Sequence, residues 1–221
     1  MDGNEIRPDR QQVLRYLGYR GQEISSDLDG QLEEALDRLA RCAEPRTLVR
    51  RLKRVSGGSF GLPLPGRDLT ALLTDCEEIL LMAATLGPGP ERELRKLAVS
   101  DLTEAVILDA CASAAIEKIC DRLEEKLAGK LQAEGLWLTD RFSPGYGDLP
   151  LTVQRDWCAV LDTARRIGLT VTEQNILIPV KSVTAVMGIS RLPQKRSRRG
   201  CRFCGRSGNC LYRKEGRSCD A

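Results

Sequence analysis

The chain has 221 residues, of which 42% are hydrophobic and 29% charged, a composition typical of a soluble globular protein. Its longest apolar stretch, residues 79–86 with a single threonine at position 85, is too short to span a bilayer, and the charged N-terminal stretch MDGNEIRPDR lacks the apolar centre of a signal peptide. We therefore expect a cytoplasmic protein with no membrane partner. The absence of histidine excludes the commonest general base and metal-ligating nitrogen.

The net charge of +3 hides an asymmetry along the chain. Residues 191–221 contain ten Lys or Arg against two acidic residues, whereas residues 1–190 contain 24 basic and 29 acidic residues. We expect one main domain over residues 1–190, followed by a basic, cysteine-rich tail over residues 191–221.

The first clear element is an amphipathic helix. Apolar residues recur at three and four positions from Leu28 to Ala43, after a possible helix cap at Ser26 or Asp27 and before Pro45. This spacing places the apolar side chains on one face of a helix.

The next region alternates between extended and broken stretches. Residues 47–66 read as an edge strand followed by loops, and residues 69–76 indicate a helix. Residues 77–87 fit either a buried strand or a helix, and the sequence GPGP at 87–90 ends whichever of the two forms.

A long helix is predicted from residue 100 to about residue 134, with Ser100 as its N-cap. Its middle, residues 109–115, consists of small side chains that suit tight packing, and Glu117 follows on the same face. A glutamate on a helix is usually solvated. The apolar side of the helix is expected to comprise Leu102, Ala105, Val106, Ile116, Ile119, Leu123 and Leu127.

The sequence RFSPGYGDLP at 141–150 predicts a turn, because Pro144 fixes one backbone angle while Gly145 and Gly147 permit conformations that side chains disfavour. Arg141 and Tyr146 flank or occupy this turn. Taken alone, the two residues would be a surface ion-pair partner and a packed aromatic ring.

Two further elements follow the turn. Residues 152–166 predict an amphipathic helix with Trp157, Val160, Leu161 and Ala164 facing inward. The β-branched stretch NILIPVKSVTAVMGIS, broken at Pro179, predicts two short strands.

Three segments together resemble the activation domain of cobalamin-dependent methionine synthase: residues 85–121, the sequence RFSPGYGDLPL and the sequence PVKSVTAVMGI. The resemblance covers roughly residues 60–190. It implies an α+β fold, with a twisted antiparallel sheet flanked by helices, and a groove that binds S-adenosylmethionine.

The family signature Arg-x-x-x-Gly-Tyr is met here by Arg141, Gly145 and Tyr146. By resemblance, Arg141 would hold the carboxylate of the methionine portion, and the backbone around Phe142, Pro144 and Gly145 would contact the adenine. Tyr146 would lie at the reacting sulfonium methyl, where an aromatic ring favours positive charge.

Glu117 matches a family acid on the long helix, so the resemblance implies a contact to the ligand or to Tyr146. The family's N-terminal aspartate has no matching segment here, and Asp27 and Asp29 are candidates by composition only.

The resemblance implies a reductive methylation. In that chemistry, cob(II)alamin receives an electron and the resulting cob(I)alamin attacks the methyl group of S-adenosylmethionine, so the domain positions a ligand and needs no general base. Because this chain lacks recognisable folate, homocysteine and cobalamin modules, the cobalamin would be carried by a separate methionine synthase or another corrinoid protein. An electron donor is a second implied partner.

The tail sequence CRFCGRSGNCLYRKEGRSC holds Cys201, Cys204, Cys210 and Cys219, and a CxxC pair with two further cysteines in a reducing compartment predicts a metal site. Either an iron–sulfur cluster or zinc would accept four thiolates. An iron–sulfur cluster is favoured because reactivation requires an electron.

The positive charge of the tail supports an alternative function, a metal knuckle that binds nucleic acid, although Phe203 and Tyr212 are its only aromatic residues. The remaining five cysteines are expected to lie in the core: Cys42, Cys76, Cys111, Cys120 and Cys158.

Overall fold

The computed structural model describes residues 6–19, 21–55 and 58–194. The chain divides into two compact units. The first comprises the described residues of Met1–Leu48, Ala83–Glu125 and Leu161–Val183, and the second those of Val49–Met82, Lys126–Val160 and Thr184–Ala221.

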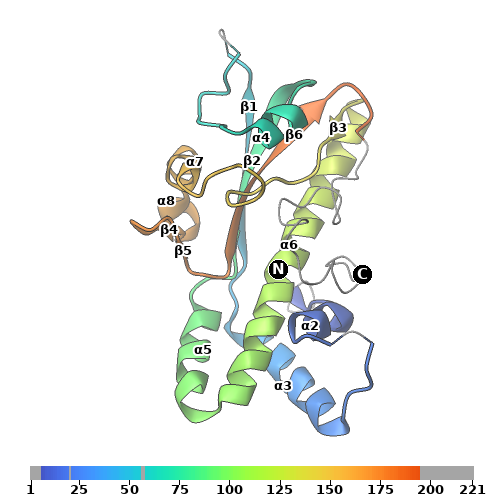
Figure 1. The fold of residues 1–221 in the computed structure, drawn as a ribbon, viewed down its shortest axis with the longest axis vertical. Coiled ribbons are helices and arrows are strands. Elements are labelled where there is room, and N and C mark those ends of the chain that lie inside the picture. The colour runs from blue at the N-terminus through green and yellow to red at the C-terminus, as the bar shows by residue number, and fades with distance from the viewer. Residues whose placement is uncertain (1–5, 20, 56–57, 195–221) are drawn as a thin grey trace. The chain divides into compact units, whose positions relative to one another are not determined.

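Helices and strands are interspersed along the chain, which ends with three successive strands in its described part (Figure 1). The helices are α2 (Arg10–Tyr16), α3 (Ser26–Cys42), α4 (Arg67–Leu72), α5 (Gly89–Ser100), α6 (Leu102–Ala133), α7 (Val153–Leu161) and α8 (Thr163–Ile167). The strands are β1 (Arg46–Lys53), β2 (Cys76–Thr85), β3 (Trp137–Leu138), β4 (Thr170–Val171), β5 (Leu177–Ile178) and β6 (Ser182–Ser190). None of these described helices is long and apolar enough to cross a membrane.

The main sheet has the strand order β1-β2-β6-β3 and is antiparallel. In the pairing of β3 with β6, Trp137 lies opposite Ser190 and Leu138 opposite Ile189. Strands β4 and β5 form a separate antiparallel pair. The α+β class with an antiparallel sheet is therefore confirmed, whereas the cysteine-rich tail lies outside the described residues.

Helix α3 confirms the first predicted helix, with a cap one residue earlier than expected. The Ser25 hydroxyl accepts a hydrogen bond from the Leu28 amide at 3.2 Å, so Ser25, and neither Ser26 nor Asp27, caps the helix. The apolar face is buried at Leu32, Ala35, Leu36 and Leu39.

Helix α5 begins within the GPGP segment, whose sequence predicts only the end of the preceding element. Proline is accepted in the first turn of a helix because its missing N–H would have no intrahelical partner there. Ser100 is the last residue of α5, so the predicted cap of the long helix at Ser100 is wrong. The Asp101 carboxylate instead accepts a hydrogen bond from the Glu104 amide at 2.9 Å.

The predicted apolar side of the long helix needs correction at its N-terminal end. Leu102 is 69% exposed and Val106 is 53% exposed, whereas Ala105, Ile116 and Ile119 are buried. Leu123 and Leu127 are only half-buried, so the periodicity predicts burial best in the middle of α6.

Strand β2 resolves the ambiguity at residues 77–87. The strand is buried continuously from Ile79 to its last residue, Thr85, and a strand buried on both faces shows no alternation of polar and apolar residues. The helix predicted over residues 69–76 is too long, because α4 ends at Leu72 and Cys76 already belongs to β2.

The helix predicted over residues 152–166 is two helices, α7 and α8. Asp162 between them has a left-handed backbone with φ of 54°, which interrupts the helical hydrogen bonding. Trp157 is fully buried as expected, and its indole N–H donates to the Pro63 carbonyl at 3.1 Å, whereas Ala164 is exposed. Strands β5 and β6 confirm the two strands predicted on either side of Pro179.

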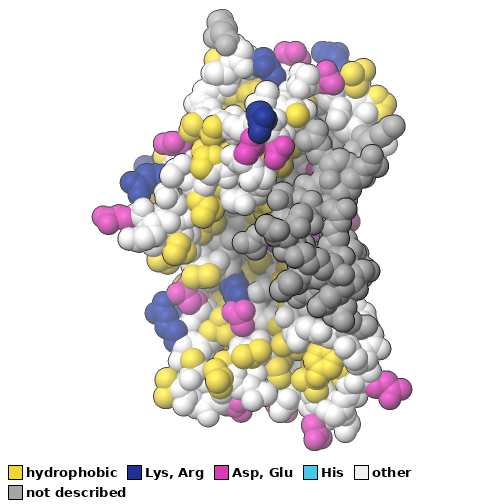
Figure 2. Space-filling view, in the orientation of Figure 1, with side chains coloured by type: hydrophobic (Ala, Val, Ile, Leu, Met, Phe, Trp, Pro, Cys, Tyr) yellow, Lys and Arg dark blue, Asp and Glu magenta, His cyan; other side chains and the backbone are white. Residues whose placement is uncertain are grey.

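The visible face of the molecule carries acidic and basic side chains interspersed among apolar and polar ones (Figure 2). On that face, outside the grey atoms, neither sign of charge forms a single continuous patch. This mixture agrees with the near balance of acidic and basic residues over residues 1–190.

Candidate functional site

The segment 141–150 belongs to the second unit and is fixed at its start by the main sheet. Phe142 and Val186 of β6 exchange two backbone hydrogen bonds, each of 2.9 Å. The chain then reverses, as the amide of Tyr146 donates to the Ser143 carbonyl at 3.1 Å and the amide of Gly145 donates to the Leu149 carbonyl at 2.8 Å. The predicted turn is present and has a defined backbone.

Glycine is needed at positions 145 and 147 of the turn for different structural reasons. Gly145 has φ of 91°, and a Cβ atom there would meet only the Leu151 side chain, at 3.2 Å. Gly147 has φ of 51°, and a Cβ atom there would overlap the Asp68 carboxylate. Gly145 is thus required mainly for its backbone angle, and Gly147 also for close packing against α4.

The turn leaves the predicted ligand residues at different depths. Tyr146 is 63% exposed and Gly145 is exposed, whereas Arg141 and Phe142 are half-buried and Pro144 is buried. A guanidinium and an aromatic ring therefore come from one short segment whose backbone is anchored on β6. Such an arrangement can contact a small molecule with an anionic and a cationic group.

Asp148 ties the end of the turn to the start of α4. Its Oδ2 accepts a hydrogen bond from the Arg67 amide at 2.6 Å, and its Oδ1 accepts one from the Asp68 amide at 3.2 Å. Both hydrogen bonds favour the ionised carboxylate and so lower the pKa of Asp148. The bond from the Arg67 amide is the larger cause. Sequence reasoning missed this role, since the partners lie about 80 residues away and no local pattern links them.

Glu117 lies on α6 in the first unit and is half-buried. The predicted turn residues lie in the second unit, so the structure does not test a contact between Glu117 and Tyr146, and this stays a prediction. Of the two N-terminal candidates, Asp27 is exposed and Asp29 forms an ion pair with Arg10.

Within the first unit, Lys181 and Ser182 join three segments. The Lys181 ammonium lies 2.7 Å from Asp109 Oδ1 and donates to Ser113 Oγ at 2.8 Å, both on α6. The Ser182 hydroxyl hydrogen-bonds the Thr85 hydroxyl at 2.8 Å, at the end of β2. The Lys181 side chain is only 14% exposed, so these polar groups are used by the fold itself.

A surface hollow lined by several charged side chains also lies in the first unit. Its lining includes Lys118 and Arg122 together with the acidic Asp9, Asp121 and Glu125. Desolvation is the largest cause of a lowered pKa of Lys118, whose ammonium also donates to the Arg7 carbonyl. The hollow contains none of the residues predicted to bind a ligand.

The predicted metal ligands Cys201, Cys204, Cys210 and Cys219 lie outside the described residues, as does the basic stretch on which nucleic-acid binding was predicted. Within residues 6–19, 21–55 and 58–194, no cluster of three or more His, Cys, Asp or Glu could hold a metal ion.

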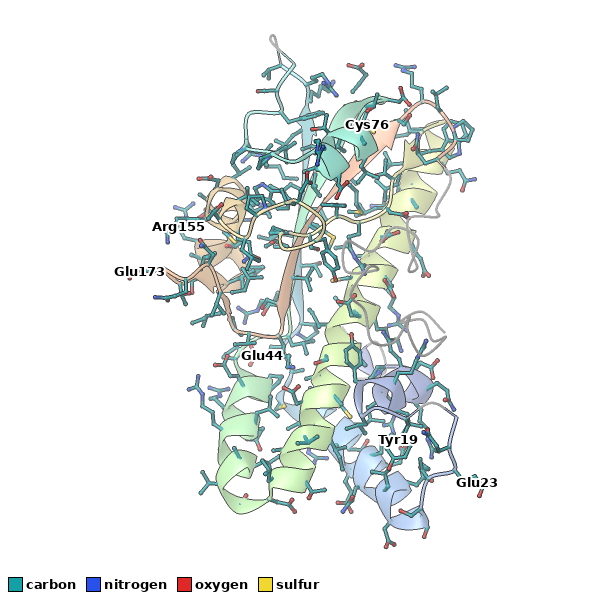
Figure 3. All side chains as sticks on the ribbon, in the orientation of Figure 1. Tyr19, Glu23, Glu44, Cys76, Arg155 and Glu173 are labelled. Carbon is teal, nitrogen blue, oxygen red and sulfur yellow. The ribbon has the colours of Figure 1, made fainter. Side chains whose placement is uncertain are left out.

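The five other cysteines behave as core residues. Cys76, Cys111, Cys120 and Cys158 are buried, and Cys42 is half-buried. Burial raises the pKa of Cys76, at the start of β2 (Figure 3), to about 11 and that of Cys111 to about 12. Both thiols are therefore protonated at neutral pH and unsuited to nucleophilic chemistry.

Neither a protein-family model nor a curated protein sequence matches the chain. Among solved structures, the chain is similar to one described as the MetH reactivation domain bound to AdoHcy, with a TM-score of 0.64 and 17% sequence identity. The match covers 85% of this chain and 76% of the other. The resemblance identified from the sequence is thereby confirmed at the level of architecture: this chain has the fold of the MetH reactivation domain.

Proposed function

We propose that this chain binds S-adenosylmethionine through the turn at 141–146 and presents its methyl group to a corrinoid held by a separate protein. The observation that carries the proposal is the position of Tyr146, exposed between two glycines on a turn that also supplies Arg141. The fold supports it, because the similar reactivation domain is bound to AdoHcy, the product left when S-adenosylmethionine loses its methyl group.

Each part of the turn suits a different part of the ligand. The Arg141 guanidinium offers paired donors to the carboxylate of the methionine portion. The backbone from Phe142 to Gly145 receives the adenine, where the absence of a Cβ atom at Gly145 permits close approach. The exposed ring of Tyr146 faces the sulfonium, since the face of an aromatic ring attracts positive charge.

The proposed reaction asks this chain to position a ligand. The corrinoid cobalt supplies the nucleophile when that partner is bound, so no residue of this chain has to act as a base. This agrees with the absence of histidine from the sequence. Tyr146 and Arg141 fix the methyl group in one orientation, which turns a bimolecular encounter into a local step.

The proposed partners are the cobalamin-binding modules of a methionine synthase or another corrinoid protein, with an electron donor. Their involvement rests on the chemistry of reductive methylation and on the fold shared with a reactivation domain. The tail cysteines are proposed to hold an iron–sulfur cluster or zinc, and the metal content of the purified full chain tests that part separately.

Calorimetric titration of the full chain with S-adenosylmethionine and with AdoHcy tests the binding. We expect saturable binding by the wild-type chain and a loss of about tenfold to a hundredfold in Arg141→Ala, which removes charge-assisted hydrogen bonds. Arg166→Ala is the matched control, because Arg166 is an exposed arginine on α8 of the first unit. Absence of binding by the folded wild-type chain contradicts the proposal.

A further inference from the structure

We propose that Asp148 is a positioning residue that holds the turn in the conformation that presents Tyr146 to the ligand. The inference rests on the proposed function, because the ligand is the one that the turn is proposed to bind. Asp148 itself would not touch that ligand; it acts through the backbone of the turn.

The first support is the way the carboxylate is used. Its two oxygens accept from two consecutive amides, those of Arg67 at 2.6 Å and Asp68 at 3.2 Å. These N–H groups stand at the start of α4, where no earlier helical carbonyl is available to them. The single carboxylate thus satisfies two backbone donors from a segment distant in sequence.

The second support is the close fit between the two segments, which uses glycine on both sides. Gly66 has φ of 103°, and a Cβ atom there would overlap the Asp148 carboxylate. In return, a Cβ atom at Gly147 would overlap the carboxylate of Asp68. The turn and the start of α4 therefore lie so close that a Cβ atom at either glycine would force the facing aspartate side chain to move.

The third support is a short path from Asp148 to Tyr146. The amide of Leu149 donates to the Tyr146 carbonyl at 3.0 Å, and the amide of Gly145 donates to the Leu149 carbonyl at 2.8 Å. Leu149 is buried, and Leu69 of α4 is fully buried as well. Asp148 thus connects the turn to a helix that is anchored in the core of the second unit.

A side-chain contact to Tyr146 is not needed for this effect. The two residues are separated only by Gly147, whose backbone would relax if its neighbour lost its anchor, because glycine has the widest conformational freedom. The ring of Tyr146 would then sample several orientations, and binding a ligand would require ordering it again.

The experiment compares Asp148→Asn and Asp148→Ala with the wild-type full chain by two measurements. Hydrogen exchange of peptides spanning 143–150 reports the turn, and calorimetric titration with AdoHcy reports the ligand site. We expect exchange of the turn amides to be at least about tenfold faster in Asp148→Ala, with AdoHcy affinity about tenfold weaker. Asn retains one acceptor oxygen, so Asp148→Asn should give a smaller increase in exchange rate and a smaller decrease in AdoHcy affinity.

Asp156→Asn is the matched control, because Asp156 is an exposed aspartate on α7 of the same chain. It should leave both measurements unchanged. Circular dichroism and the unfolding midpoint establish that each variant is folded, and Asp148→Asn keeps the test valid if Asp148→Ala does not fold.

A double-mutant cycle with Tyr146→Ala distinguishes positioning from general support of the fold. If Asp148 acts through Tyr146, Asp148→Asn should cost little further AdoHcy affinity once the ring is absent, although it should still speed exchange of the turn. An equal loss of affinity with and without the ring overturns the route through Tyr146. Unchanged affinity in both Asp148 variants overturns the assignment altogether.

Failure of the proposed function gives a different result. If the wild-type chain does not bind AdoHcy, the ligand assignment and the positioning role fail together. Faster exchange in Asp148→Ala would then still show that the carboxylate holds the turn, whereas unchanged exchange would overturn that as well.

Discussion

Two segments of this chain use proline and glycine for different purposes, one for close backbone packing and the other for an exposed turn. The sequence GPGP at 87–90, in the first unit, and the sequence PGYG at 144–147, in the second, both combine proline with two glycines. At Gly89 a Cβ atom would overlap the Cys42 carbonyl oxygen, so the first segment is closed against the backbone of α3. At Gly145 a Cβ atom would meet only the end of the Leu151 side chain.

The difference shows what glycine contributes in each place. In the first segment it permits backbone to lie against backbone, and helix α5 starts there. In the second it permits an unusual backbone angle that leaves Tyr146 63% exposed. The unfolding free energy should therefore respond mainly to added side-chain volume in the first segment. In the second segment it should respond mainly to the preferred backbone angle of the substituted residue.

The largest expected effect is at Gly89. Gly89→Ala places a methyl group against the Cys42 carbonyl, a backbone atom that cannot move aside without shifting the end of α3, so we expect a loss of about 3 kcal/mol or more of unfolding free energy. Urea unfolding measures it. Gly30→Ala is the control, because Gly30 is exposed on α3 with nothing near its Cβ position. That change should stabilise the chain by about 0.5–1 kcal/mol, and a neutral Gly89→Ala would contradict the closed packing.

A smaller effect is expected at Lys181, whose carbonyl accepts the Leu86 amide beside the closed segment. Lys181→Met keeps the apolar stem but removes the interactions with Asp109 and Ser113, so the unfolding free energy should fall by about 2 kcal/mol. Lys96→Met is the control, since Lys96 is 72% exposed and pairs with Glu93 on its own helix. Equal effects of the two substitutions would mean that the Lys181 contacts add little.

Gly145→Ala tests the turn at 144–147, the second of the two segments. The expected loss is about 1 kcal/mol, because the cost comes from a backbone angle that L residues disfavour and the nearby Leu151 side chain can adjust. The chain should fold, while its AdoHcy affinity should decrease as the turn changes shape. A loss of unfolding free energy as large as that of Gly89→Ala would show that the turn is also tightly packed at Gly145.

The smallest effect is the pH dependence of the Asp148 contacts. The folded chain holds the pKa of Asp148 below its usual value near 3.8, chiefly through the Arg67 amide. The stabilisation is therefore complete above the unfolded pKa and is lost as the pH falls through the lower folded pKa. The stability difference between the wild-type chain and Asp148→Asn, measured by unfolding from pH 6 to pH 2, should shrink toward the acid end. A constant difference would exclude the carboxylate charge as its source.

Local sequence patterns predicted the features that depend on local chemistry. The period of Leu32, Leu36 and Leu39 is enough to place one face of α3, and the Pro-Gly pattern at 144–147 is enough to predict a turn. The resemblance added the fold, which the comparison with a solved structure confirms, and it named the candidate ligand residues.

The missed features depend on chain conformation or on distant partners. Proline in GPGP can end one element or begin the next, and only the structure shows that α5 starts there. The left-handed backbone of Asp162, which divides α7 from α8, has no signal in a helical pattern. The hydrogen bonds of Asp148 to Arg67 and Asp68 join residues some 80 positions apart, so no local window contains both partners.

The charge pattern of β1 has a consequence for association between copies. This strand ends the order of the main sheet, and in the described part of the chain no further strand pairs with its outer side. Arg50 and Lys53 are exposed along it, whereas Arg51, also exposed, forms ion pairs with Glu78 and Glu134. A second molecule approaching edge to edge would bring Arg50 and Lys53 near their own copies, and like charges on an edge strand disfavour strand pairing and aggregation.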